Sequence, residues 1–195
     1  MAKAQKAPQT IEAAYEEERA RSEKEHHLPS AGAMIGHVSS NLVIHLLKIE
    51  QARLFAGGPT SFFLEEVAPQ WQKAEAAFLT KINDSLFSEG DLIPTTTDEF
   101  LQFSMVEQSA AGKYAQGQDQ LFGLIKDFDT QLLFVERAEK LARKEGHFGQ
   151  VRLMEELDSW LKEQIARGQK FLGHEVREGL YQEEDDEEDE EDDED

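Results

Sequence analysis

The chain has 195 residues, a formal net charge of −21 at pH 7 and no cysteine. The absence of thiols excludes disulfide bonds, thiolate zinc sites and thiol nucleophiles. No apolar run approaches the roughly 18 residues of a membrane span, and the polar start lacks the apolar core of a signal peptide, so the sequence predicts a soluble cytoplasmic protein.

Residues 1–30 are polar and predict an N-terminal arm rather than part of a core. An Ala-rich stretch within them favours an exposed helix over residues 13–25, which ends before Pro29.

Two segments with apolar residues at helical spacing follow the arm. The first covers about residues 33–56 and stops at the Gly-Gly-Pro break of residues 57–59. The second begins near Thr60 or Ser61, either of which is a good N-cap. Since the break is so short, the two helices must be antiparallel neighbours. Their apolar stripes are Ile35, Val38, Leu42, Leu46 and Ile49 in the first helix, and Phe63, Val67, Trp71, Ala74, Phe78, Ile82 and Leu86 in the second.

A long polar connection occupies residues 88–116. Within it, Thr96 and Glu99 have the Thr-x-x-Glu spacing of a capping box, so we expect one short helix inside this crossover.

Two further amphipathic helices are predicted over about residues 117–145 and 149–173, with Gly146 as the C-cap between them. Two helical hairpins joined by one long crossover is the connectivity of ferritin-like four-helix bundles. The sequence therefore predicts an all-α, ferritin-like bundle over residues 31–175.

The negative charge is concentrated at the C-terminus. Residues 183–195 are all acidic and supply 13 of the 41 carboxylates, which leaves 28 acidic against 20 basic side chains elsewhere. A block of like charges repels itself and has no apolar group to bury. Residues 176–195 are accordingly predicted to be a disordered acidic tail.

Histidines offer few metal sites. A di-iron site within one bundle needs paired Glu-x-x-His motifs on facing helices, and the single match, Glu23 and His26, lies in the arm. The pair His26 and His27 is a weak candidate for a transition metal. His37 and His45 are eight residues apart, too far to chelate one ion, and we interpret them as surface or interface residues.

The stretch "NLVIHLLKIEQARLFAGGPTSFFLEEVAPQWQKAEAAFLTKINDSLFSEGDLIPTT" resembles the mini-ferritins of the Dps family (DNA-binding proteins from starved cells). The helix, the glycine turn, the aromatic restart and the "G..P..T" exit match that family in order and spacing. "LDSWLKEQI" resembles the start of the family's last core helix, so the resemblance covers about residues 33–173. It implies a hollow homo-oligomer of 12 subunits, with a ferroxidase site across the dimer interface and the crossover helix at a two-fold contact.

The ligands of that family site are mostly replaced. By the resemblance, Arg53 stands at the position of the first-helix histidine, Glu65 at that of the second-helix histidine and Pro69 at that of an aspartate. Thr80 and Asp84 occupy the remaining aspartate and glutamate positions. Glu65 and Asp84 are thus the metal ligands that remain.

Arg53 carries a guanidinium, which stays protonated and has no lone pair for a metal. We expect it to form an ion pair with Glu65 or Asp84, within or across subunits, in the place where relatives hold iron. The alternative is that Arg53 extends into water near the helix end. Pro69 removes a backbone donor inside the second helix and predicts a kink there.

Relatives that bind DNA use lysine-rich termini to neutralise phosphates. Here the arm is close to neutral and the acidic run repels DNA, so Lys3 and Lys6 are the DNA contacts that the sequence offers. The acidic tail is interpreted either as a collector of hard cations such as Fe²⁺, Mn²⁺ or Ca²⁺, or as a device for solubility.

These observations favour a Dps-like cage for stress protection by sequestration of iron or another metal, with DNA protection left open and the ferroxidase centre degenerate. One alternative is an active ferroxidase that uses relocated carboxylates such as Glu50, Glu65, Glu66 and Asp84. Another is a helical adaptor that forms no cage and binds basic partners through its acidic tail.

Overall fold

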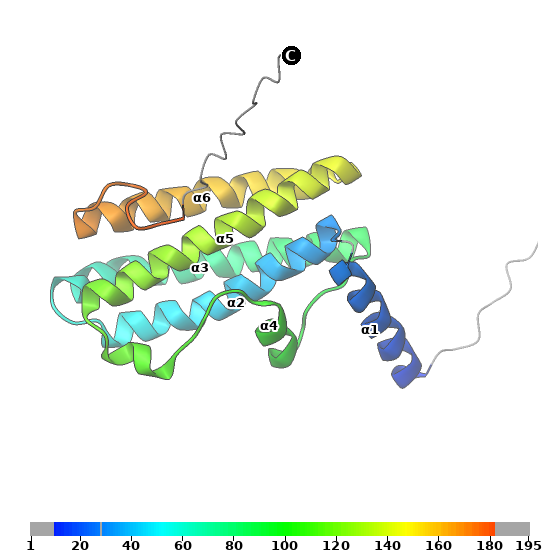
Figure 1. Cartoon of the computed structure of the whole chain (residues 1–195), viewed down its shortest axis with the longest axis horizontal. Coiled ribbons are helices and arrows are strands. Elements are labelled where there is room, and N and C mark those ends of the chain that lie inside the picture. Colours follow the sequence, from blue (N-terminus) through cyan, green and yellow to red (C-terminus); the bar gives the residue numbers. More distant parts are fainter. Residues whose placement is uncertain (1–9, 28, 182–195) are drawn as a thin grey trace, which may run out of the picture.

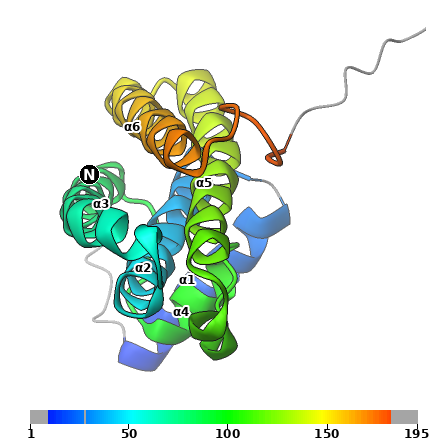
Figure 2. The ribbon, with the colours of Figure 1, turned by 90° about the vertical axis from the view of Figure 1, so that its left-hand side faces the viewer.

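A computed structural model describes residues 10–27 and 29–181 (Figure 1). The chain is helical in these ranges, which contain no strand, and none of their helices is long and apolar enough to cross a membrane. The elements in chain order are α1 (Ile11–His27), α2 (Ala31–Phe55), α3 (Pro59–Glu89), α4 (Thr97–Phe103), the 3₁₀ helix η1 (Ala110–Tyr114), α5 (Gly117–Glu145) and α6 (Phe148–Leu172). The four long helices α2, α3, α5 and α6 form the predicted ferritin-like bundle (Figure 2).

The turn between α2 and α3 places Gly58 at a φ of 65°, a left-handed conformation that glycine adopts without steric cost. α3 begins directly after it at Pro59, whose fixed φ and missing N–H suit the first helical position. The prediction that Thr60 or Ser61 caps α3 is wrong, because both residues lie inside the helix. Ser61 instead donates its hydroxyl to the Gly58 carbonyl at 2.8 Å.

Pro69 does not end α3, which continues through it to Glu89. Proline has no N–H for the carbonyl four residues earlier, here that of Glu65. Because Pro69 and Glu65 both lie on the exposed side of α3, that carbonyl need not be buried without a partner.

The crossover from α3 to α5 passes along α2, and the predicted capping box begins its helix. Thr96 accepts a hydrogen bond from the Glu99 N–H, and the Glu99 carboxylate accepts one from the Thr96 N–H. Buried Asn41 of α2 then accepts hydrogen bonds from the Met105 N–H at 2.7 Å and the Ser104 hydroxyl at 3.2 Å. These contacts fix the end of α4 against the bundle.

The second hairpin turns at Gly146, which caps α5 with a φ of 83°, as its position in the sequence predicts. Further along, α5 and α6 approach closely at Gly168. A Cβ at this position would lie 2.7 Å from Cδ1 of Ile125, so the contact between the two helices depends on the missing side chain.

Aromatic and aliphatic side chains from all four long helices fill the bundle core. Trp71 of α3 packs edge-on against Phe128 of α5, with ring centroids 5.1 Å apart, and Trp160 of α6 also meets Phe128 edge-on at 5.7 Å. The indole N–H of Trp71 donates to Gln164 Oε1 at 2.8 Å, so its polar atom is satisfied. Burial of each such side chain contributes about 1.5–3 kcal/mol.

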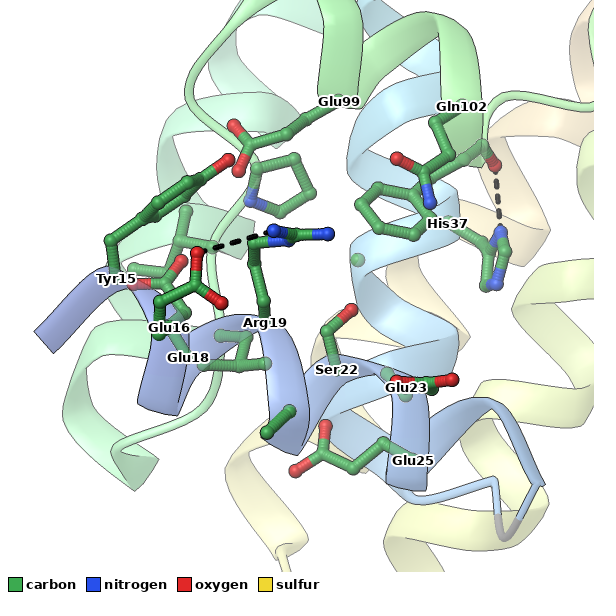
Figure 3. A pocket seen from close by; sticks show the side chains of 17 residues that line it. Tyr15, Glu16, Glu18, Arg19, Ser22, Glu23, Glu25, His37, Glu99 and Gln102 are labelled. Carbon is green, nitrogen blue, oxygen red and sulfur yellow. Dashed lines mark hydrogen bonds and ion pairs between the residues drawn. The ribbon is translucent and has the colours of Figure 1, made fainter. Parts of the chain in front are cut away.

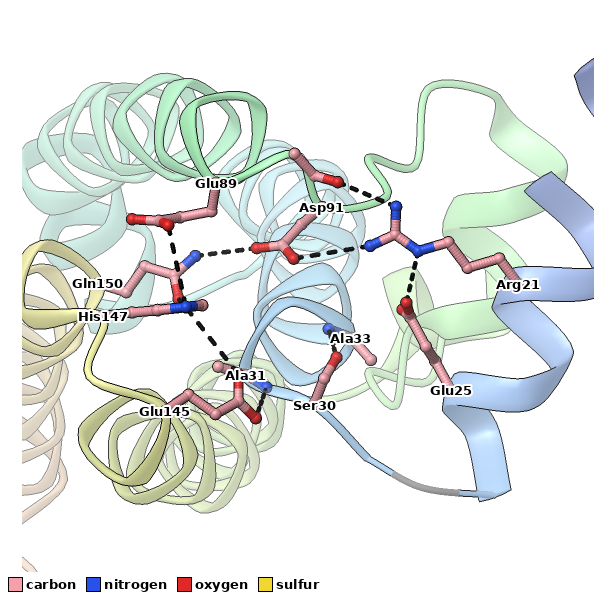
Figure 4. A network of polar contacts seen from close by, with 11 residues as sticks. Arg21, Glu25, Ser30, Ala31, Ala33, Glu89, Asp91, Glu145, His147 and Gln150 are labelled. Atoms are coloured by element: carbon pink, nitrogen blue, oxygen red, sulfur yellow. Dashed lines mark hydrogen bonds and ion pairs between the residues drawn. The ribbon is translucent and has the colours of Figure 1, made fainter. Parts of the chain in front are cut away.

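α1 projects from one end of the bundle and is tied to it through Asp91 (Figure 4). Arg21 of α1 donates to the Gly90 carbonyl at 3.0 Å and lies 3.9 Å from the Asp91 carboxylate. Asp91 in turn accepts a hydrogen bond from Gln150 of α6 at 3.1 Å. A Cβ on Gly32 would lie 2.3 Å from Cγ of Asp91, so this glycine gives the carboxylate its space.

Residues 176–181, assigned above to the acidic tail, lie against the bundle instead. Asp129 of α5 accepts hydrogen bonds from Arg177 at 2.7 Å and from the Tyr181 N–H at 3.0 Å. Leu180 is buried beside them. Gln169 of α6 also donates to the Glu178 carbonyl at 2.9 Å, so side chains of α5 and α6 both hold this segment, which composition did not indicate. The acidic run of residues 183–195 lies outside the described residues.

Candidate functional site

The hairpin cluster, made of Glu50, Arg53, Glu65 and Gln72, lies where α2 and α3 approach their turn. Arg53 binds the Glu50 carboxylate with two nitrogens, Nε at 2.9 Å and Nη2 at 2.6 Å. Gln72 of α3 donates to the same carboxylate at 3.1 Å, and Glu65 lies 3.6 Å from the guanidinium. Arg53 thus makes its shortest contacts with a residue of its own helix.

These contacts lower the pKa of Glu50 to about 2, mainly through the hydrogen bonds from Arg53 and then from Gln72. The Glu50 carboxylate in turn raises the pKa of Arg53. Both side chains remain partly exposed, at 41% for Glu50 and 25% for Arg53. Within one chain this is a half-exposed ion pair.

The positions transferred from the family site are spread along α3. Glu65 and Asp84 are 19 residues apart on one helix, a separation of about 28 Å at 1.5 Å per residue, so they cannot bind one ion within a chain. Thr80 donates its hydroxyl to the Ala76 carbonyl at 3.0 Å, and Pro69 has no donor atom for a metal. With a permanent cation at Arg53, this residue set does not fit an iron site built by one subunit.

The core cluster, made of His45, Lys48, Glu75 and Asp127, joins three helices inside the bundle. His45 of α2 and Glu75 of α3 are both fully buried, and His45 Nδ1 lies 2.6 Å from Glu75 Oε1. The other ring nitrogen, Nε2, faces Asp127 Oδ2 of α5 at 3.9 Å. Lys48, one turn after His45, places its ammonium 2.5 Å from the same Asp127 oxygen.

Burial dominates the electrostatics of the core cluster. It raises the pKa of Glu75, an effect that the nearby His45 opposes. It also raises the pKa of Asp127, against the attraction of His45 and Lys48. His45 Nε2 and Glu75 Oε2 find no hydrogen-bond partner among the described residues. Asp127 Oδ2 likewise finds no hydrogen-bond partner among them, and its closest charged neighbour there is the ammonium of Lys48. The cluster thus holds two carboxyl groups in a setting that disfavours their negative charge.

The interpretation of His45 as a surface or interface residue is wrong. Its ring is fully buried and meets Phe128 edge-on, with ring centroids 4.6 Å apart. His45 follows Leu42 by three residues, and Glu75 lies between Trp71 and Phe78 on the buried stripe of α3. A charged residue within an apolar stripe is the signal in the sequence that marks this cluster.

A cavity of about 590 Å³ lies between α1, α2 and α4 (Figure 3). Its lining includes Tyr15, His37 and several carboxylates, among them Glu23 of the Glu-x-x-His motif. His37 Nδ1 lies 2.7 Å from the Phe103 carbonyl, so this histidine holds α4 against α2. The cavity is acidic and open to solvent, and its charges are typical of a solvated groove.

Other predicted site residues lie elsewhere or outside the described ranges. Glu66, a proposed relocated ligand, binds Arg167 of α6 at 3.0 Å. Lys3 and Lys6 lie outside the described residues, and so do the side chains of His26 and His27. In the part of the chain that the structure describes, no three histidine, aspartate or glutamate side chains converge on one metal position.

Comparison with solved structures finds close likeness to Dps proteins. DpsB of Lactococcus lactis is 35% identical, with a TM-score of 0.80 over 85% of this chain and 96% of that one. DpsA of the same organism is 33% identical, with a TM-score of 0.78 over 87% of this chain and 99% of the other. Dps from Listeria monocytogenes, at 19% identity, shares the fold with a TM-score of 0.73 over 76% of this chain and 97% of that one. No protein-family model and no curated protein matches the sequence.

Proposed function

The chain belongs to the Dps family, and from that membership we propose that it forms a closed homo-oligomeric shell of 12 subunits that sequesters metal ions during stress. The observation that carries the proposal is the likeness to two Dps proteins over 96% and 99% of their length.

An apolar surface on α2 and the crossover supports assembly. Leu47 and Leu54, two turns apart on α2, are each 59% exposed, as is Leu101 of α4, while Met105 is 56% exposed. A contiguous apolar patch on the surface of a soluble protein marks an interaction site, and we infer that these side chains contribute to one. A second copy of the chain is the partner that the family provides for this surface.

We propose further that the family's inter-subunit oxidation site has lost its function in this chain. Arg53 brings a permanent positive charge to the position of a metal-binding imidazole, and Glu50 is already bound by Arg53 and Gln72. Fe²⁺ would have to displace these contacts and tolerate the guanidinium. Relocated ligands at the hairpin are disfavoured for the same reason, because Glu50 and Glu66 already bind arginines.

Metal ions are the proposed cargo in preference to DNA. The net charge of −21 gives a shell of many copies a strong negative field, which attracts cations and repels phosphates. DNA contact would then depend on Lys3 and Lys6. A cytoplasmic location is part of this proposal.

Two measurements test the proposal. Light scattering on the full-length protein should give a particle several times heavier than the 22.1 kDa chain, near twelve copies. A particle of monomer mass would refute the shell and favour the adaptor.

Fe²⁺ oxidation by O₂, followed by the absorbance of the ferric product, should be slow and unchanged in Glu65→Gln and Asp84→Asn variants. Rapid oxidation that either variant abolishes would show that the family site works despite Arg53.

A further inference from the structure

His45 has the arrangement of a metal-binding histidine. Its Nδ1 lies 2.6 Å from Glu75 Oε1, both side chains are fully buried, and Nε2 finds no hydrogen-bond partner among the described residues. Histidines that bind metals commonly donate one ring N–H to a carboxylate, which fixes the ring and leaves the lone pair of the other nitrogen for the ion. Glu75 is placed to do this for His45.

The free nitrogen faces an oxygen donor from another helix. His45 Nε2 and Asp127 Oδ2 are 3.9 Å apart, which brings a nitrogen of α2 and an oxygen of α5 close enough to share one ion after a small movement. An ion at ordinary bond lengths from a nitrogen and an oxygen in tetrahedral geometry holds these atoms about 3.4 Å apart. A side-chain adjustment of about half an ångström closes that difference.

We propose that His45 Nε2 and Asp127 Oδ2 bind one divalent transition-metal ion inside the bundle of each chain, with Glu75 as the residue that positions His45. One imidazole and one carboxylate suit Zn²⁺, Fe²⁺ or Co²⁺ better than Ca²⁺, which prefers oxygen ligands alone. Two protein ligands leave the remaining coordination positions to water. The site lies within one chain, so it does not depend on the proposed shell or on the hairpin cluster.

Lys48 supplies the positive charge beside Asp127 in the present arrangement. Its ammonium lies 2.5 Å from Asp127 Oδ2, and its side chain is 22% exposed, so it can swing toward solvent when an ion enters. The negative charge of Glu107 on the crossover also acts on Asp127 and adds to the attraction for a cation. Gln131, one turn after Asp127 on α5, is fully buried, and neither of its amide atoms has a hydrogen-bond partner among the described residues.

The first test is a Co²⁺ titration of full-length protein that has been freed of metal with a chelator. Co²⁺ on the acidic run would remain six-coordinate and weakly coloured, whereas Co²⁺ at the proposed site gains a nitrogen ligand and a lower coordination number. We expect intense visible bands that saturate at one equivalent per chain. A spectrum no different from Co²⁺ in buffer would overturn the proposal.

Matched variants locate the binding. His45→Gln and Asp127→Asn should abolish the bands, and Glu75→Gln should weaken the affinity about 10-fold to 100-fold, as loss of an orienting carboxylate does. Glu50→Gln alters the hairpin cluster instead and should leave the titration unchanged. Bands that survive both His45→Gln and Asp127→Asn would show that Co²⁺ binds elsewhere.

Crystals of the wild-type protein soaked in Zn²⁺ give a test that no unfolded variant can obscure. An anomalous peak between His45 and Asp127 is expected, in addition to any peak at the surface. Absence of that peak, or ordinary water density in its place, would overturn the proposal. Neither result depends on the particle mass or on iron oxidation at the hairpin. The metal site proposed here and the proposed function of the protein can therefore be refuted independently.

Discussion

Replacing His45 and Glu75 one at a time and then together should reveal how strongly the two residues depend on each other. His45→Leu leaves the Glu75 carboxyl in an apolar interior with no partner, and Glu75→Met leaves the N–H of His45 Nδ1 without an acceptor. The double variant removes both polar groups and puts side chains of similar volume in their place.

The magnitudes follow from the burial of the pair. Both side chains are fully buried, and burial already raises the pKa of Glu75, so in His45→Leu the carboxyl becomes protonated and unpaired rather than charged. An unsatisfied buried polar group costs about 1–3 kcal/mol, and we expect each single variant to lose about that much stability. Since apolar replacement of both partners is often nearly neutral, the double variant should lie within about 1 kcal/mol of wild type.

Guanidinium unfolding followed by tryptophan fluorescence suits this experiment, because Trp71 and Trp160 both pack on Phe128 beside the cluster. All variants must be compared at one subunit concentration, since assembly stabilises the folded state by mass action. A double variant whose loss equals the sum of the single losses would refute the reasoning. If the double variant is as stable as wild type, the pair is not required for stability, and its retention calls for a role such as metal binding.

Three further predictions concern the rest of the chain. Gly168→Ala should destabilise the protein by about 1–3 kcal/mol through overpacking against α5. Gly123→Ala has open space around the added Cβ and should stabilise the protein by about 0.5–1 kcal/mol. Thermal unfolding of both variants checks that the two changes in stability have opposite signs. The pKa of Glu50 falls from 4.5 to about 2 on folding. The difference in unfolding free energy between wild type and Glu50→Gln should therefore be constant above pH 4.5 and disappear as the pH falls through 2. A difference in unfolding free energy that stays constant down to pH 2 would contradict the contact with Arg53. Deletion of residues 183–195 should leave the number of subunits in the particle unchanged. It should lower the amount of Mn²⁺ that the protein retains in equilibrium dialysis at low ionic strength. A change in subunit number would show that the acidic run takes part in assembly.

Local signals predicted the helices well because each depends on residues only a few positions apart. The capping box of Thr96 and Glu99 and the left-handed Gly146 are such signals, and the structure confirms both. The turn after Gly58 was less well predicted, because Pro59 and two nearby N-cap residues compete to begin α3. Which of these residues begins α3 depends on the backbone conformation of the turn.

The candidate sites were harder to predict, since they depend on how helices rotate against one another. His45, Glu75 and Asp127 come from three helices, and no spacing within one segment shows that they meet. The contact of Arg53 with Glu50 is different, because i, i+3 spacing on one helix predicts it directly. The partners implied by the resemblance, Glu65 and Asp84, lie far apart within one chain because α3 separates them.

The attachment of α1 through Asp91 has a consequence for how such a protein diverges. The direction in which the N-terminal segment leaves the body is set by one carboxylate, the Arg21 that meets it and the bare backbone of Gly32. None of these groups belongs to the bundle core. A lineage could therefore reorient its outermost helix by changing a single side chain, while the four-helix bundle beneath it keeps its shape.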